Sequence, residues 1–156
     1  MMIGTVFMDI AEEWRNIDRF LMNYERLGIA DQAGLETETL KIQRSRNDQA
    51  YFLYIFTRFE KCVDEAVDHI VQNRTQDADW AERRIWQAWY GTSRRRPEFM
   101  RKVEILFDKN RNNFKTIQYY HKIRNEIAHG GEWTEQLAIP QVAEAIDSLV
   151  SDFPTT

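Results

Sequence analysis

The sequence is poor in residues that cross-link, bend or interrupt a chain. Its 156 residues include one cysteine, Cys62, with three prolines and six glycines. A single cysteine cannot form a disulfide within the chain, so we expect a reducing compartment and a cytoplasmic location. No apolar run reaches the roughly 20 residues of a membrane-spanning helix. The first residues have no basic region and reach an acidic residue within ten positions, unlike a secretory signal. The sequence therefore argues against a secreted disulfide scaffold and against a membrane protein.

The composition instead indicates a folded globular domain. Hydrophobic residues make up 43% of the chain and aromatic residues 13%, beside 29% charged residues. This balance differs from that of disordered segments, which have few aromatics and a high net charge. A chain of this length can bury a core without disulfides or metal. We find no linker or repeat, so residues 1–156 are expected to form a single domain.

Hydrophobic residues recur every three or four positions in several segments, which is the spacing of one face of an α-helix. In the first stripe, Phe7, Ile10, Trp14 and Ile17 are expected to face inward. The predicted helices cover approximately residues 7–28, 45–73, 77–91, 97–106, 111–129 and 140–153. Asp77 is the expected N-cap of the third helix. No segment alternates with the period of a strand, so the sequence predicts an all-α antiparallel bundle of about five to six helices.

The charge is unevenly distributed along the chain. Residues 94–124 contain ten basic and three acidic residues, a net charge of +7, whereas the remainder has 11 basic and 22 acidic residues, a net charge of −11. The two parts sum to the overall −4. A basic segment on an acidic body can bind polyanions locally, although solvated helix faces would give the same pattern.

Arg124 has an unexpected position in the segment HKIRNEIAHGG, residues 121–131. On a helical wheel with about 100° per residue, Ile117, Tyr120 and Ile127 define an apolar arc, and Arg124 falls in its middle. A guanidinium on the core side is costly unless it is paired or reaches a cleft. Arg124 therefore either pairs with a carboxylate of another helix, for which Glu60 is a candidate, or serves a site.

His129 lies at the expected end of the same helix, immediately before Gly130 and Gly131. A left-handed turn at these glycines could bring the imidazole toward Arg124, where histidine would suit acid–base chemistry at neutral pH. The alternative is a histidine that only caps the helix. Glu126 and His129 also have the E-x-x-H spacing of di-iron bundles, but Glu126 lies opposite the apolar arc and the spacing occurs once. No metal site is expected.

The stretch RNEIAHG, residues 124–130, resembles the R-x(4–6)-H motif of HEPN domains, and the helical bundle around it is similar to theirs. The resemblance implies a metal-independent endoribonuclease without cofactors, acting as a homodimer in a toxin or antiphage defence system. It assigns catalysis to Arg124 and His129 of both subunits, with Asn125 in support. An antitoxin or a nucleotidyltransferase-type protein is the implied partner. Other HEPN domains are non-catalytic modules that bind proteins or nucleotides, and this alternative stays open.

The chemistry of RNA cleavage makes a dimer reasonable. Attack by a ribose 2′-OH needs a proton acceptor, a proton donor and positive charge at the phosphate. One chain offers one motif histidine, and a two-fold pairing supplies two. The product would be a 2′,3′-cyclic phosphate, and DNA should not react. Basic residues expected to contact the RNA backbone are Arg94, Arg95, Arg96, Lys102, Arg111 and Lys115.

Overall fold

The computed structural model describes residues 4–26, 37–76, 79–91, 98–131 and 133–154, and these residues form six helices without a strand. The helices are α1 (Gly4–Arg26), α3 (Thr37–Thr75), α4 (Trp80–Gly91), α5 (Phe99–Leu106), α6 (Asn112–Ala128) and α7 (Ile139–Ser151). The predicted all-α fold is confirmed. Within the described ranges, none of these helices combines the length and the apolar character needed to cross a bilayer.

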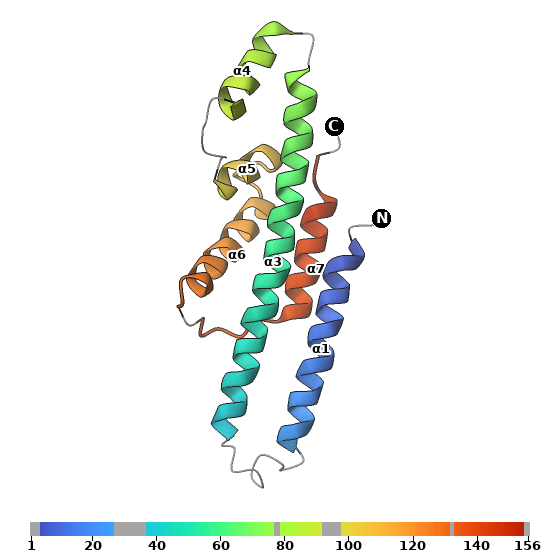
Figure 1. The fold of residues 1–156 in the computed structure, drawn as a ribbon, viewed down its shortest axis with the longest axis vertical. Coiled ribbons are helices and arrows are strands. Elements are labelled where there is room, and N and C mark those ends of the chain that lie inside the picture. The colour runs from blue at the N-terminus through green and yellow to red at the C-terminus, as the bar shows by residue number, and fades with distance from the viewer. Residues whose placement is uncertain (1–3, 27–36, 77–78, 92–97, 132, 155–156) are drawn as a thin grey trace.

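The 39-residue helix α3 is the axis of the molecule, and each of the other five described helices packs against it (Figure 1). α1 and α7 lie along one side of α3 and pack against each other. Helices α4, α5 and α6 follow one another along the other side. The motif helix α6 is therefore held against the middle of α3.

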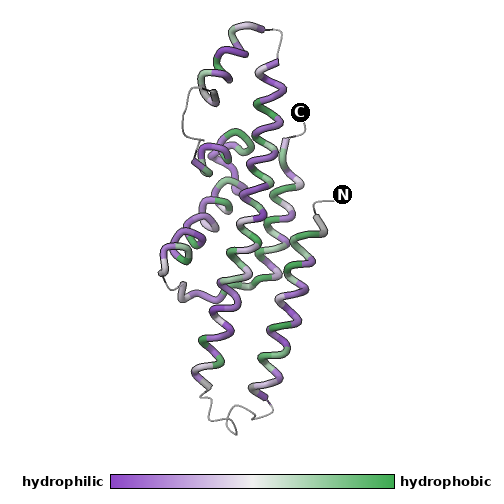
Figure 2. Tube along the Cα trace, viewed as in Figure 1, coloured by the Kyte–Doolittle hydropathy of each residue, from purple (hydrophilic) through white to green (hydrophobic). Residues whose placement is uncertain are grey.

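The core forms where these two groups of helices meet on α3. Phe52, Phe56 and Phe59 are fully buried, as their spacing predicts. The ring of Phe56 lies edge-on to Phe59, with 5.7 Å between centroids, and edge-on to Phe99 of α5, at 5.5 Å. Hydrophobic and hydrophilic positions alternate along each helix, as expected for amphipathic helices (Figure 2). Aromatic packing thus fixes α5 against α3 next to the motif helix.

The C-terminal part of α1 and the N-terminal part of α3, which lie side by side, differ from the prediction. α3 begins at Thr37, eight residues before the predicted start, and Ile17 is 40% exposed although its spacing placed it inward. α7 does not extend along this part of the α1–α3 pair, which is at the lower end of Figure 1. Polar contacts join the two helices instead. Trp14 donates to Asp48 at 2.8 Å, and Arg44 pairs with Asp18 at 2.9 Å. A search for apolar stripes does not detect an interface of this kind.

The start of α4 also differs from the prediction. Asp77, the expected N-cap, lies outside the described residues. Asp79 directly precedes the first helical residue, and its Oδ1 accepts a hydrogen bond from the backbone N–H of Ala81 at 2.7 Å. Asp79 therefore satisfies one of the free N–H groups of the first turn, as an N-cap does.

Candidate functional site

The motif helix α6 presents one face to the core and another to solvent. Phe114, Ile117 and Ile123 are buried, which fixes the rotation of the helix about its axis. Arg124 and Asn125 lie in the last turn, and both are half-buried. The two residues are therefore at the boundary between the core and the exposed face.

Arg124 pairs with the carboxylate that the sequence suggested. Its Nε lies 3.3 Å from Oε1 of Glu60 on α3. The side chains are 34% and 23% exposed, so the pair lies at the edge of the core. Burial raises the pKa of Glu60, and the charge of Arg124 opposes that rise. Arg124 also donates from Nη1 to Oδ1 of Asn125 at 3.2 Å. The guanidinium is thus held in one place by two neighbours.

His121 joins this group from one helical turn earlier. Its Nε2 lies 3.4 Å from Nδ2 of Asn125, and its ring stacks on Phe99 with 5.1 Å between centroids. Burial lowers the pKa of His121, and the nearby charge of Arg124 lowers it further. His121 was not among the site residues predicted from the sequence. The four-residue spacing between His121 and Asn125, which places both on one helix face, was the available signal.

The end of α6 is a Schellman motif, a turn that satisfies the last carbonyls of a helix. The N–H of Gly130 donates to the carbonyl of Ile127 at 3.0 Å, and the N–H of Gly131 donates to that of Glu126 at 2.9 Å. Gly130 has a φ of +80°, whereas His129 keeps a φ of −88°. The left-handed turn therefore follows His129 and does not swing it toward Arg124. His129 is exposed, and among the described residues none forms a hydrogen bond with its side chain.

The turn after His129 gives a testable prediction. Gly130→Ala should lower the free energy of unfolding by about 1–2 kcal/mol, because a side chain with a Cβ is strained at this positive φ. Gly130→Asn should cost less, because asparagine tolerates the left-handed conformation. Urea unfolding of the three proteins measures the difference. Equal stability of wild type and the alanine variant would show that the turn can change its geometry freely.

An open groove runs along the exposed face of α6. Its volume is about 610 Å³, and Met100 of α5 forms one wall. His121 and Asn125 line it together with Lys115 and Lys122. Glu126 also lines the groove, with its Oε1 4.0 Å from Nζ of Lys122, so the charged lining residues, two lysines and one glutamate, leave a net positive charge. Such a hollow can admit an extended anionic ligand.

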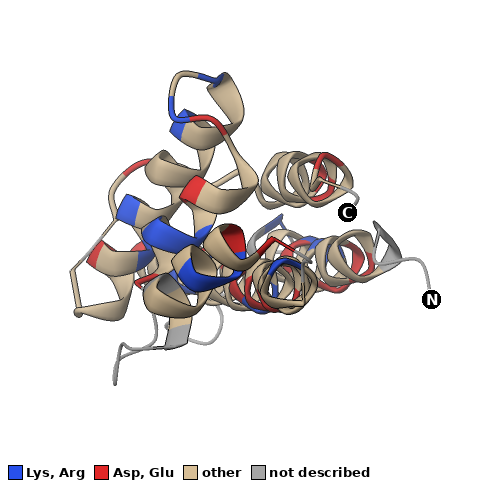
Figure 3. Cartoon of the chain, turned by 90° about the horizontal axis from the view of Figure 1, so that it is seen from above, with Lys and Arg blue, Asp and Glu red and all other residues tan. Residues whose placement is uncertain are grey.

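The residues expected to contact RNA have different environments. Arg111 and Lys115 are exposed, and Lys115 lines the groove. Lys102 differs from the expectation that it contacts the RNA backbone. It is only 7% exposed, and its Nζ donates a hydrogen bond to Oδ1 of Asp64 on α3 at 2.7 Å. A buried ammonium that is already paired cannot contact an RNA backbone. Arg94, Arg95 and Arg96 lie outside the described residues. Figure 3 shows several Lys and Arg positions on the side of the molecule formed by α4, α5 and α6.

No protein-family model, curated protein or solved structure matches the chain. The resemblance to HEPN domains therefore depends on the RNEIAHG motif and on the helical architecture around it. The function must be argued from the residues themselves.

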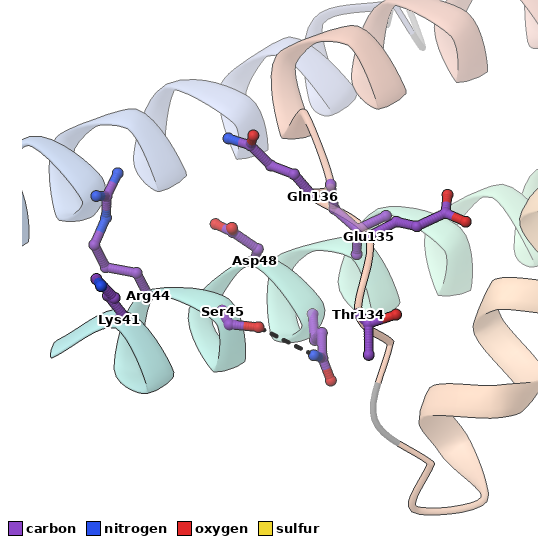
Figure 4. Close-up of a pocket in the computed structure, with 9 residues that line it drawn as sticks. Lys41, Arg44, Ser45, Asp48, Thr134, Glu135 and Gln136 are labelled. Carbon is purple, nitrogen blue, oxygen red and sulfur yellow. Dashed lines mark hydrogen bonds between the residues drawn. The ribbon is translucent and has the colours of Figure 1, made fainter. Parts of the chain in front are cut away.

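Two further features of the described residues bear on chemistry. Within the described ranges, no three His, Cys, Asp or Glu side chains cluster as a metal site requires. A second hollow of about 280 Å³ lies between α3 and the segment that precedes α7 (Figure 4). Its charged lining residues are Lys41, Arg44, Asp48 and Glu135, so it has no net charge. This hollow does not favour an anionic ligand, unlike the groove beside α6.

Proposed function

We propose that the protein is a cytoplasmic, metal-independent endoribonuclease that acts as a homodimer in a toxin or antiphage defence system. The observation that carries the proposal is the position of Arg124. Its guanidinium is oriented by Glu60 and Asn125, stays one-third exposed and lies next to the groove that Asn125 lines. A guanidinium binds phosphate oxygens in pairs and remains charged at any working pH. Arg124 is therefore suited to binding a scissile phosphate.

The proposed reaction is transfer of the phosphate within the RNA strand. The 2′-oxygen attacks phosphorus and the bond to the 5′-oxygen breaks, which gives a 2′,3′-cyclic phosphate and a 5′-hydroxyl. One histidine takes the proton of the 2′-OH, and another gives a proton to the leaving oxygen. Two copies of His129, brought together by a two-fold axis, would serve as this pair. Arg124 would stabilise the charge that develops on the phosphorane.

A second function is favoured by one specific contact. Arg124 already has a carboxylate partner, Glu60, within its own chain. The arginine could then be purely structural, and the protein a non-catalytic helical module. Such a module would bind a protein of the antitoxin or nucleotidyltransferase type, or a nucleotide. The two functions differ in whether RNA is cleaved.

RNA cleavage in EDTA is the test. Purified protein should cleave RNA to a 2′,3′-cyclic phosphate and leave a matched oligonucleotide with 2′-deoxyribose intact. His129→Ala should reduce the cleavage rate by at least about 100-fold, the usual contribution of a general acid or base. His69→Ala is the matched control, because His69 is an exposed histidine on α3. No cleavage by the wild type would favour the binding module. Unchanged cleavage by the His129 variant would exclude His129 from the reaction and overturn the proposed site.

The solution mass tests the dimer independently. Light scattering at the concentration of the cleavage assay should give twice the mass of the 18.7 kDa chain. An active monomer would contradict the two-fold site, since one chain would then supply every catalytic group.

A further inference from the structure

The hydrogen bonds around Asn125 have a defined direction. A guanidinium only donates hydrogen bonds, so the group of Asn125 that faces Arg124 must be its oxygen, and the 3.2 Å contact is to Oδ1. The amide nitrogen, Nδ2, then points toward His121 at 3.4 Å. Because this nitrogen also only donates, Nε2 of His121 must accept. This geometry fits a neutral imidazole with its proton on Nδ1.

The surroundings of His121 favour the same neutral form. α5 packs against the ring with Phe99 and Met100, which carry no charge, and α3 contributes Phe56, whose ring centroid lies 6.3 Å away. The carboxylate of α3 on this side, Glu60, is occupied by Arg124. The remaining charged groups of α6 along the groove are Lys115, Lys122 and Glu126. Burial and Arg124 together lower the pKa of His121, so the ring is expected to be neutral at pH 7.

We infer that His121 is a positioning residue of the RNA-cleaving site: its neutral imidazole fixes the Asn125 amide, whose oxygen in turn holds the Arg124 guanidinium beside the groove. The inference rests on the proposed function. It adds a residue outside the RNEIAHG motif and gives that residue a role distinct from proton transfer. Glu60 holds the other side of the guanidinium, so Arg124 is aligned from two helices.

Protonation of His121 should disrupt this arrangement. A proton on Nε2 would face the N–H of Asn125, and two donors cannot form a hydrogen bond. The amide would turn away, and Arg124 would lose the acceptor that orients it. Since the pKa of His121 lies below the usual value of about 6.5, cleavage should fall as pH drops below that value. The pH–rate profile of the wild type should therefore have a lower limb that depends on His121.

Two substitutions separate positioning from proton transfer. His121→Gln keeps an acceptor, the side-chain oxygen, but cannot titrate. It should cleave RNA within about threefold of the wild-type rate at pH 7.5 and should lack the His121-dependent limb. His121→Leu removes the acceptor, so the Asn125 amide is no longer fixed, and the cleavage rate should fall about tenfold or more, which corresponds to about 1.4 kcal/mol in the barrier. Thermal melting of both variants verifies that they are folded.

The outcomes decide the inference. A glutamine variant as inactive as the leucine variant would overturn it, because His121 would then act as an acid or base. Wild-type rates and an unchanged pH limb in both variants would overturn it as well. The ¹⁵N shifts of the His121 ring give a readout that needs no activity: Nδ1 protonated and Nε2 bare supports the arrangement, and the opposite tautomer overturns it. An inactive wild type would contradict the proposed function, while the ¹⁵N shifts would still decide the tautomer.

Discussion

Arg124→Ala should reduce kcat/KM for RNA cleavage in EDTA by at least about 100-fold, because removing a group that stabilises developing charge costs about 10²–10³ in rate. The same substitution should reduce stability by only about 1 kcal/mol. The pair with Glu60 is partly exposed, so solvent screens it, and exposed ion pairs contribute little to stability. A large loss of activity with a small loss of stability is the result expected for a residue of the site.

Two companion variants sharpen this result. Arg124→Lys keeps the charge but loses the planar fork, so it should restore only part of the activity. Glu60→Gln removes the negative charge but keeps an oxygen that can accept a hydrogen bond from Arg124, so it should reduce cleavage less than Arg124→Ala does. Wild-type kcat/KM in Arg124→Ala would exclude the arginine from the chemistry. Its pair with Glu60 would then be purely structural, and the cleaving groups would have to lie elsewhere in the chain.

Phe56→Ala should lower the free energy of unfolding by about 3–5 kcal/mol, the usual cost of truncating a buried phenylalanine. The side chain is fully buried, and its ring contacts Phe52, Phe59 and Phe99. The resulting cavity would lie under both α5 and α6. Urea or guanidinium unfolding followed by circular dichroism measures the change.

Tyr54→Ala is the matched control for Phe56→Ala. Tyr54 lies on the same helix and is also aromatic, but it is 45% exposed, so its loss should cost less than about 1 kcal/mol. If both substitutions cost the same, the aromatic core of α3 would not be the main source of stability. If Phe56→Ala left the free energy of unfolding almost unchanged, the space vacated by the ring would have to be filled by neighbouring side chains without leaving a cavity.

The sequence predicted those parts of the fold that depend on apolar spacing. The buried face in the middle of α3 could be predicted, because its aromatic residues recur at helical intervals. These residues are Phe52, Phe56 and Phe59. The contact between the C-terminal part of α1 and the N-terminal part of α3 could not be predicted, because polar pairs such as Arg44 with Asp18 replace apolar contacts there. A hydrophobic pattern contains no information about such pairs.

The environment of Arg124, but not that of Lys102 or His121, was predicted for a similar reason. Glu60 was named as a partner of Arg124 because a core-facing guanidinium needs a carboxylate, and that pair is present. Lys102 was expected at the surface, as most lysines are, but Asp64 of α3 holds it in the core. The sequence shows neither which helix neighbours α5 nor the stacking of His121 on Phe99. Contacts between elements decide the environment of an ionisable group, and they emerge only in the folded chain.

The packing of α1 against α7 has a consequence for how the chain folds during synthesis. α1 ends at Arg26 and α7 begins at Ile139, so more than 100 residues separate two helices that pack side by side. Closing such a long loop is entropically costly, and contacts of this kind form late. On the ribosome, α1 emerges before α7, so α1 can pack against α3 while the part of its apolar face that α7 covers stays exposed until α7 has been made. The contact between α1 and α7 is therefore expected to be among the last contacts of the described residues to form.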